Sequence, residues 1–269
     1  MAGLREWAGQ MMLRAPAPLR SLRNAPLIGG LIHRLSHSVV PADEKIWAQI
    51  EFGPAKGIWL HLNPRTGAHY LRGEGEEATQ AALAARLLSG MVFYDVGANV
   101  GFFSLLGAKM VGPSGKVFSF EPDAQVAARL REHVAKNEFA NVTVTEAGVW
   151  SSTTMLNFAA AADSMSPDHG TGKFLANGGG QSLRCVSIDD FARTAPPPDA
   201  IKCDVEGAEI EVMRGAIETL RAHRPWIICE THSAECDSGT REILSGIGYV
   251  IRRVDDNHFV ALPRVEDGA

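Results

Sequence analysis

Cysteine is scarce and positive charge is not in excess in this chain of 269 residues. The four cysteines, Cys185, Cys203, Cys229 and Cys236, show no CxxC spacing, and three of them lie inside apolar runs. Disulfides and a structural zinc site are therefore not expected, and the composition favours a reducing, cytoplasmic compartment. A net charge of −5 gives no electrostatic reason to expect nucleic acid as a partner.

Long apolar runs are also missing. No stretch approaches the ~18 residues of a membrane span, and Arg14 interrupts the one segment that could have formed the core of a signal peptide. We therefore expect neither a membrane span nor export. Residues 1–40 remain unusual, because three prolines break up any long helix and five arginines face a single glutamate. This segment is either a basic arm that makes peripheral contact with acidic lipid or covers the substrate site, or a partly ordered helical lead-in.

Two common nucleotide-binding fingerprints are absent as well. In the segment DVGANVGFFS, a G-x-G-x-x-G pattern that starts at Gly97 fails at two positions, the first of them Asn99. The Gly-Lys-Ser/Thr ending of a P-loop does not occur there either. What is present is D-x-G-x-N-x-G, formed by Asp95, Gly97, Asn99 and Gly101. Gly97 permits a tight turn close to a ligand, and Gly101 opens a helix whose free N–H groups attract an anion.

Apolar runs alternate with amphipathic segments from residue 91 onward, which is the pattern of an α/β fold. Strands are predicted at 91–96, 116–121, 141–148, 200–205, 225–231, 249–254 and 258–262. Helices are predicted at 101–111, after Pro122, along one face formed by Ile210, Met213, Ile217 and Leu220, and near 236–246. The sheet should be mostly parallel and end in an antiparallel hairpin. We predict an N-terminal extension over 1–70 and a single α/β domain over 71–269.

Residues 149–190 interrupt this alternation. They contain the glycine-rich stretch NGGG at 177–180 and no clear helix. The segment is either a surface excursion with a small hairpin or a flap on the substrate side, because long loops in compact domains often act as lids. Both interpretations stay open.

Acidic side chains follow three of the predicted strands. Glu121 ends the second strand, where a carboxylate can accept hydrogen bonds from both hydroxyls of a nucleoside ribose. Asp204 and Glu206 follow the fourth strand, and Glu230 and His232 follow the fifth. Ligands of open parallel sheets bind at the carboxyl ends of strands, so these groups should surround the reactive end of a bound cofactor. Either Asp204 or Glu206 could instead only cap the next helix.

The segments FYDVGANVGFFS, FSFEPD, IKCDVEGAEIEVMRG and PWIICETH together resemble the FkbM family of S-adenosylmethionine-dependent methyltransferases. The resemblance implies a Rossmann-like class I methyltransferase fold, with a seven-strand sheet and a C-terminal antiparallel hairpin. It also implies O-methylation of a hydroxyl on a sugar, a glycan or a small-molecule natural product. Carried over by position, the cofactor-binding residues would be Asp95, Gly97, Asn99, Gly101, Glu121, Ala147 and Gly148, with Asp204 predicted to join them.

The chemistry at the acceptor end leaves two mechanisms open. The sulfonium methyl is already activated, so the enzyme must align a hydroxyl and remove its proton, and His232, Glu206 or Glu230 could act as the base. Alternatively, Asp204 and Glu230 hold Mg²⁺ or Mn²⁺, which would bind and acidify the hydroxyl. The alternative function is a nucleotide-binding protein or an NAD-dependent oxidoreductase without methyl transfer. The broken glycine pattern and the terminal hairpin argue against it.

Overall fold

The structure, a computed structural model, describes residues 2–16, 19, 39–41, 43–159, 173–175 and 180–264. These residues form two compact units, one within 1–77 and the other within 78–269. No helix in the described ranges is both long and apolar enough to cross a membrane. All four cysteines are buried and free, as small core side chains commonly are.

The first unit packs one helix on a two-stranded ribbon. α1 (Ala2–Arg14) contacts β1 (Ile46–Gln49), β1 pairs antiparallel with β2 (Trp59–Leu62), and α4 (Ala68–Leu71) follows. Gly9 permits the close contact between helix and ribbon, because a Cβ there would lie only 3.0 Å from Ile46 Cδ1.

Arginines of the first unit are partly neutralised by local acids. Arg14 Nε donates to Glu51 Oε1 at 2.9 Å, and Arg5 lies 4.0 Å from Glu44. The other three arginines of the N-terminal segment lie outside the described residues. Lipid contact through residues 1–40 therefore stays a prediction.

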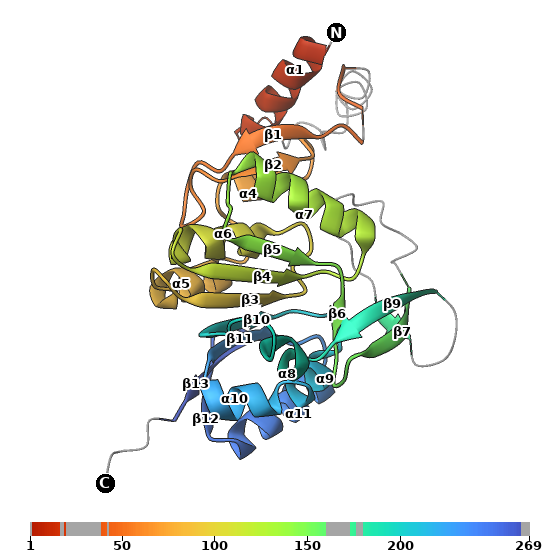
Figure 1. Cartoon of the computed structure of the whole chain (residues 1–269). Coiled ribbons are helices and arrows are strands. Elements are labelled where there is room, and N and C mark those ends of the chain that lie inside the picture. The colour runs from red at the N-terminus through yellow and green to blue at the C-terminus, as the bar shows by residue number, and fades with distance from the viewer. Residues whose placement is uncertain are drawn as a thin grey trace. The chain divides into compact units, whose positions relative to one another are not determined.

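Seven strands form the central sheet of the second unit, in the order β12-β13-β11-β10-β3-β4-β5 (Figure 1). Their bounds are β3 (Val92–Val96), β4 (Lys116–Phe120), β5 (Val142–Thr145), β10 (Ala200–Cys203), β11 (Trp226–Glu230), β12 (Tyr249–Arg253) and β13 (His258–Pro263). The strands from β5 to β11 pair in parallel, whereas β13 pairs antiparallel with β11 and β12. The predicted fold class, a mostly parallel seven-strand sheet with a C-terminal hairpin, is confirmed.

Burial explains why the inner parallel strands β3, β4 and β10 have mostly apolar sequences. Every residue of β10 is buried, and so are four of the five residues in β3 and in β4. Strands buried on both faces have no solvent face that would demand alternation. Their polar side chains therefore gather at the carboxyl ends, where the loops begin.

The helices of the second unit lie before and between these strands in the chain. They are α5 (Glu77–Arg86), α6 (Phe102–Val111), α7 (Ala124–Lys136), α8 (Ile188–Ala192), α9 (Glu209–Arg214), α10 (Ile217–His223) and α11 (Ala234–Gly246). α7 starts at a side-chain cap, since Asp123 accepts hydrogen bonds from two N–H groups of its first turn. This start agrees with the helix predicted after Pro122.

The single helix predicted through residues 210–220 is wrong, because the chain breaks into α9 and α10 at Gly215. A Cβ at Gly215 would lie 2.1 Å from the carbonyl oxygen of Trp150, so the backbones approach too closely for any larger residue. Asp189 N donates to Gly215 O at 2.9 Å, and the Asp189 carboxylate accepts from two N–H groups in the first turn of α10. Asp189 therefore acts as a cap that starts a second helix.

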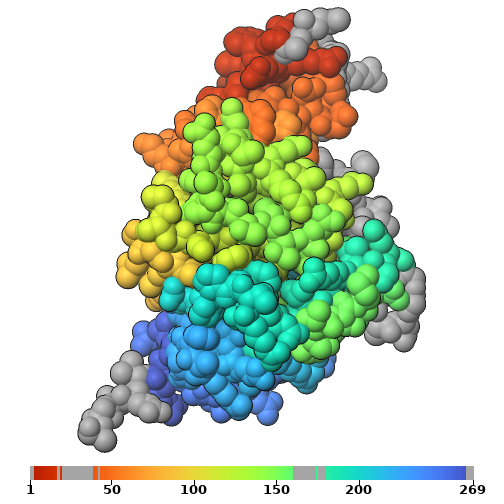
Figure 2. All heavy atoms as spheres, in the orientation of Figure 1, coloured from red at the N-terminus to blue at the C-terminus, as the bar shows by residue number. Residues whose placement is uncertain are grey.

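The described part of the segment 149–190 forms a second, smaller sheet, whereas residues 160–172 and 176–179, with most of the stretch NGGG, lie outside the described residues. The order of the small sheet is β6-β9-β7-β8, with β6 (Gly148–Val149), β7 (Thr154–Ala159), β8 (Lys173–Leu175) and β9 (Gln181–Val186). The strand predicted over 141–148 is too long, because the chain leaves the central sheet after Thr145 and enters the small sheet at Gly148. β7 and β9 pair antiparallel and lie side by side at the surface (Figure 2).

Candidate functional site

The loop after β3 brings three strand ends together. The N–H groups of Gly97 and Ala98 donate to Phe120 O at the end of β4, at 3.1 and 2.9 Å. Gly97 has φ +76°, and a Cβ there would lie 1.7 Å from Asp204 O, in the loop after β10. Only glycine permits both the left-handed backbone and this contact. The glycine identified in the sequence is therefore required where the ends of β3 and β10 meet.

Three of the predicted cofactor residues are packed inside the second unit, and none of them lines the cavity at the carboxyl edge of the central sheet. Asp95 is fully buried and accepts a hydrogen bond from Ser104 Oγ at 2.5 Å. Gly101 is the N-cap of α6, and a Cβ there would lie 1.9 Å from a methyl group of Leu130. Ala147 is 1% exposed. Their part in cofactor binding stays a prediction, and the structure gives each of them a packing role.

Glu121 connects the loop after β3 to the loop after β4. Its Oε2 accepts from Asn99 N and its Oε1 accepts from Asp123 N, both at 2.9 Å. The side chain is nearly buried, and this burial raises the pKa of Glu121 to about 7, although the two backbone hydrogen bonds oppose the shift. Each carboxylate oxygen keeps one further lone pair for a ligand.

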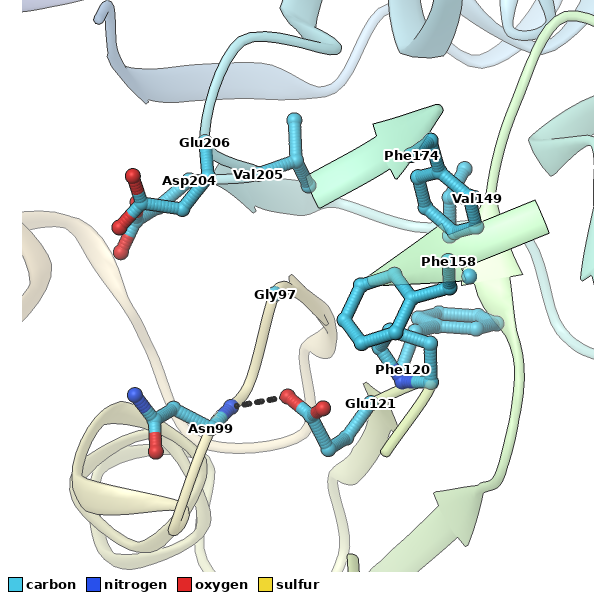
Figure 3. Close-up of a pocket in the computed structure, with 12 residues that line it drawn as sticks. Gly97, Asn99, Phe120, Glu121, Val149, Phe158, Phe174, Asp204, Val205 and Glu206 are labelled. Atoms are coloured by element: carbon cyan, nitrogen blue, oxygen red, sulfur yellow. Dashed lines mark hydrogen bonds between the residues drawn. The ribbon is translucent and has the colours of Figure 1, made fainter. Parts of the chain in front are cut away.

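A cavity of about 550 Å³ opens at the carboxyl edge of the central sheet. Six residues that the sequence predicted line it, namely Gly97, Asn99, Glu121, Gly148, Asp204 and Glu206. Asp204 and Glu206 lie across the cavity from a group of apolar side chains (Figure 3).

Four acids surround His232 next to the acidic side of the cavity. His232 Nδ1 lies 2.7 Å from Glu209 Oε1. Its Nε2 lies 3.6 Å from Asp204 Oδ1, 3.6 Å from Glu206 Oε2 and 3.9 Å from Glu230 Oε1. The loops after β10 and β11 thus bring together the three predicted catalytic residues, although Glu230 and His232 do not themselves line the cavity.

Glu209 is the residue of this cluster that the sequence analysis missed. It lies in the first turn of α9 and is fully buried, and its hydrogen bond to the ring is the largest cause of a raised pKa of His232. The charges of Glu206 and Asp204 add to the effect, and the pKa of His232 reaches about 9 despite partial burial. His232 therefore carries a proton at neutral pH in the protein alone. An acid in the first turn of a helix ordinarily signals only a favourable helix dipole, so the sequence offered no distinct signal for this role.

Glu206 has a strained backbone and a carboxylate that accepts no hydrogen bond from the described residues. Its φ of +52° is left-handed, a conformation that costs a non-glycine residue about 1 kcal/mol or more. Its nearest charged partner is His232, beyond hydrogen-bond distance, and the described residues provide it with no hydrogen bond. Strain of this kind at a cavity wall, with a carboxylate that can still accept hydrogen bonds from a ligand, points to a functional residue.

Two substitutions at position 206 separate strain from charge. Glu206→Gly and Glu206→Ala both remove the carboxylate, but only glycine relaxes the left-handed backbone. We expect the glycine variant to be more stable than the alanine variant by up to about 1 kcal/mol, measured by urea unfolding. The exposed Glu138, with φ +57°, provides the matched control pair and should show the same difference without any effect on ligand binding. A less stable glycine variant would show that residue 206 does not keep this backbone in solution.

A divalent cation at this cluster stays a prediction. Facing atoms of Asp204, Glu230 and His232 lie within 4.8 Å of one another, so the structure adds an imidazole to the two ligands predicted from the sequence. The other polar atom of each side chain already has a partner. Asp204 Oδ2 lies 3.1 Å from Lys202 Nζ, Glu230 Oε2 lies 3.3 Å from His258 Nε2, and His232 Nδ1 lies 2.7 Å from Glu209 Oε1. The two carboxylates suit Mg²⁺ or Mn²⁺, whereas an imidazole is a more usual ligand of softer divalent metals.

Comparison with known proteins identifies the family of the second unit. A model of the methyltransferase FkbM domain matches residues 95–255, more than half of the chain. The matched range begins at the glycine loop and includes the carboxylates around His232. It supports S-adenosylmethionine over NAD as the cofactor.

Individual relatives are methyltransferases as well. The chain is 28% identical over 156 residues to the hexuronic acid methyltransferase AglP of Haloferax volcanii, an alignment that covers 57% of this chain and 61% of that protein. It is 31% identical over 132 residues to an arsenite methyltransferase of Halobacterium salinarum, an alignment that covers 45% of this chain and 32% of that protein. The matches therefore span less than two thirds of either relative. Among solved structures, methyltransferase FkbM of Methylobacillus flagellatus is 23% identical, with 65% of this chain and 44% of that chain covered and a TM-score of 0.46.

Proposed function

Because this chain belongs to the FkbM family of S-adenosylmethionine-dependent methyltransferases, we propose that it methylates a hydroxyl of a sugar, a glycan or a small-molecule natural product. The observation that carries the proposal is the group of carboxylates around His232, beside the cavity that Glu121 lines. The two relatives named above share methyl transfer and differ in acceptor, so the acceptor must be argued from the site. The relative that acts on a hexuronic acid supports a sugar.

The cavity suits an S-adenosyl group in both charge and hydrogen bonding. When bound, S-adenosylmethionine supplies a methyl group on a positively charged sulfur. Asp204 would attract the charged end, and Glu121 would accept the ribose hydroxyls with the lone pairs that its backbone hydrogen bonds leave free. The backbone at Gly97, which has no Cβ, would leave room between them.

An uncharged hydroxyl is the acceptor that best suits the acidic side. A carboxylate acceptor would meet Asp204, Glu206 and Glu230, and like charges at short range disfavour its binding in ionised form. A hydroxyl can donate its hydrogen to the same groups. We therefore assign the proton-accepting role to the neutral form of His232, with Glu206 and Glu230 beside it and Glu209 orienting the ring through Nδ1.

Ligand binding tests the cofactor half of the proposal. Isothermal titration calorimetry should show binding of S-adenosylhomocysteine and no measurable binding of NAD or NADH, because the loop at Gly97 and the acids Glu121 and Asp204 suit an adenosine whose arm carries an ammonium group and no pyrophosphate. Binding of NAD without S-adenosylhomocysteine would overturn the proposal. S-adenosylhomocysteine is preferred to the substrate here because it carries no transferable methyl group.

Methyl transfer to a panel of sugars tests the acceptor half. The purified chain is incubated with methyl-labelled S-adenosylmethionine and with hexuronic acids or their neutral hexose counterparts. We expect label that resists mild alkali, since a methyl ether on a hydroxyl is stable under conditions that hydrolyse a methyl ester. Label released by mild alkali, and found only with the hexuronic acids, would identify a carboxylate acceptor and contradict the hydroxyl.

A further inference from the structure

The small sheet carries two aromatic rings into the cavity. Phe158 lies on β7 and Phe174 on β8, and both line the cavity that also contains Glu121. Their ring centroids lie 5.2 Å apart at an interplanar angle of 63°, an edge-to-face pair. Phe158 is only 6% exposed. The two rings therefore form a packed apolar wall that the central sheet does not supply.

Gly148 makes room for this wall. A Cβ on Gly148 would lie 2.4 Å from Phe174 Cζ and 3.1 Å from Cys185 Sγ. The ring of Phe174 therefore rests directly on the backbone of β6, at the point where the chain enters the small sheet. Gly148 has an ordinary backbone conformation. Glycine is therefore needed here because a side chain would collide with the ring of Phe174, and not because of the torsion angles.

The chemistry of the cavity changes in a fixed order from one side to the other. Asp204 and Glu206 lie on one side, Glu121 lies in the middle near Asn99, and Phe158 and Phe174 lie on the other side (Figure 3). An S-adenosyl cofactor has the same order of groups, an amino acid end that carries an ammonium group, a ribose diol and a flat purine. Aromatic side chains bind bases through stacking and edge contacts with little regard to hydrogen bonding.

We propose that Phe158 and Phe174 bind the adenine of the cofactor, and that Gly148 positions Phe174 for this contact. The inference rests on the proposed function, because it presumes an S-adenosyl ligand. It assigns the small sheet, β6 to β9, to cofactor recognition. Base-to-ring contacts of this kind are worth about 1–3 kcal/mol each, which corresponds to roughly 5- to 150-fold in affinity.

Calorimetry with two ligands tests this assignment on the whole chain. S-adenosylhomocysteine has both the base and the amino acid end, whereas 5′-methylthioadenosine keeps the base, the ribose and the sulfur but lacks the amino acid end. We expect the affinity for both ligands to fall by a similar factor, about 5 or more, in each of the variants Phe158→Ala, Phe174→Ala and Gly148→Ala. Asp204→Asn should weaken S-adenosylhomocysteine and leave 5′-methylthioadenosine nearly unchanged. Phe174→Leu keeps a similar volume without an aromatic face and should lose part of the affinity.

The controls separate this inference from the proposed function. Met155, exposed on the same strand as Phe158, provides a Met155→Ala variant that should bind like the wild type. Melting temperatures show which variants fold, and Phe174→Leu remains informative if an alanine variant does not. Wild-type affinity for both ligands in the ring variants, or a loss confined to S-adenosylhomocysteine, would overturn the adenine assignment while the cofactor stands. Failure of the wild type to bind either ligand would instead refute the proposed function.

Discussion

Replacing His232 with alanine is expected to lower the maximal rate of methyl transfer by about 10²- to 10⁴-fold, the usual contribution of a positioned general base. The hydroxyl would then lose the nitrogen that accepts its proton. Affinity for S-adenosylhomocysteine should change little, because His232 does not line the cavity that contains Glu121. Rates with an identified acceptor, together with calorimetry on the same variant, distinguish this outcome from loss of the fold or of the cofactor.

The pH dependence of the rate tests the same assignment. A base must be unprotonated, so a pKa of His232 near 9 places the rising part of the profile near pH 9 and not near the ordinary imidazole value of 6.5. Glu209→Gln removes the largest cause of this shift, and the profile of that variant should move toward lower pH. An unchanged profile in Glu209→Gln would mean that another group is titrated.

Stability offers a second measurement of this pKa that needs no acceptor. The folded pKa of His232 lies above its unfolded value, so the protonated ring stabilises the fold fully below about pH 6.5. That contribution is lost as pH rises through about 9. The difference in unfolding free energy between the wild type and His232→Ala should therefore shrink over this interval.

Two other outcomes would move the base away from His232. If Glu206 accepts the proton, Glu206→Gln should lose activity while His232→Ala retains most of it. If a cation acts at Asp204 and Glu230, a chelator should abolish activity and Mg²⁺ or Mn²⁺ should restore it, and Asp204→Asn and Glu230→Gln should lose metal-dependent turnover together. A chelator-insensitive enzyme that keeps full activity without His232 would contradict both the histidine and the metal.

The parts of the site that follow directly from strand ends could be predicted from the sequence. A buried parallel strand is a short apolar run, and the polar residues just after it must lie at the carboxyl edge of the sheet. This reasoning predicted that Asp204, Glu206, Glu230 and His232 lie close together. In the structure, a carboxylate oxygen of each acid lies within 4 Å of His232 Nε2. The prediction depended only on where each strand ends, and not on the path of the loop that follows.

Features set by contacts between distant segments could not be predicted in this way. The break between α9 and α10 depends on Asp189, which is far from Gly215 in the sequence but bonded to it in space. Phe158 and Phe174 reach the cavity through the pairing of β7 with β8, and the short strand β8 carries no distinct pattern in the sequence. Local periodicity does not report such pairings.

Replacing Glu121 with glutamine is expected to weaken S-adenosylhomocysteine binding by about 30- to 150-fold, or roughly 2–3 kcal/mol, the value of two charge-assisted hydrogen bonds. The amide offers one acceptor oxygen in place of two. Its NH₂ group would face a backbone N–H group that donates a hydrogen bond to the carboxylate in the wild type. Part of the loss should therefore come from a less ordered loop at Asn99. Glu146→Gln is the matched control, since Glu146 is an exposed acid at the same edge of the sheet, paired with Arg131.

The pKa of Glu121 adds a signature that a purely structural role would not produce. Because burial raises this pKa to about 7, the wild-type carboxyl becomes protonated as pH falls below 7 and then accepts fewer hydrogen bonds. Affinity for S-adenosylhomocysteine should therefore fall from pH 8 to pH 6 in the wild type and in Glu146→Gln, but stay flat in Glu121→Gln. Equal affinity in all three proteins at pH 8, with melting temperatures unchanged, would show that the ribose binds away from Glu121.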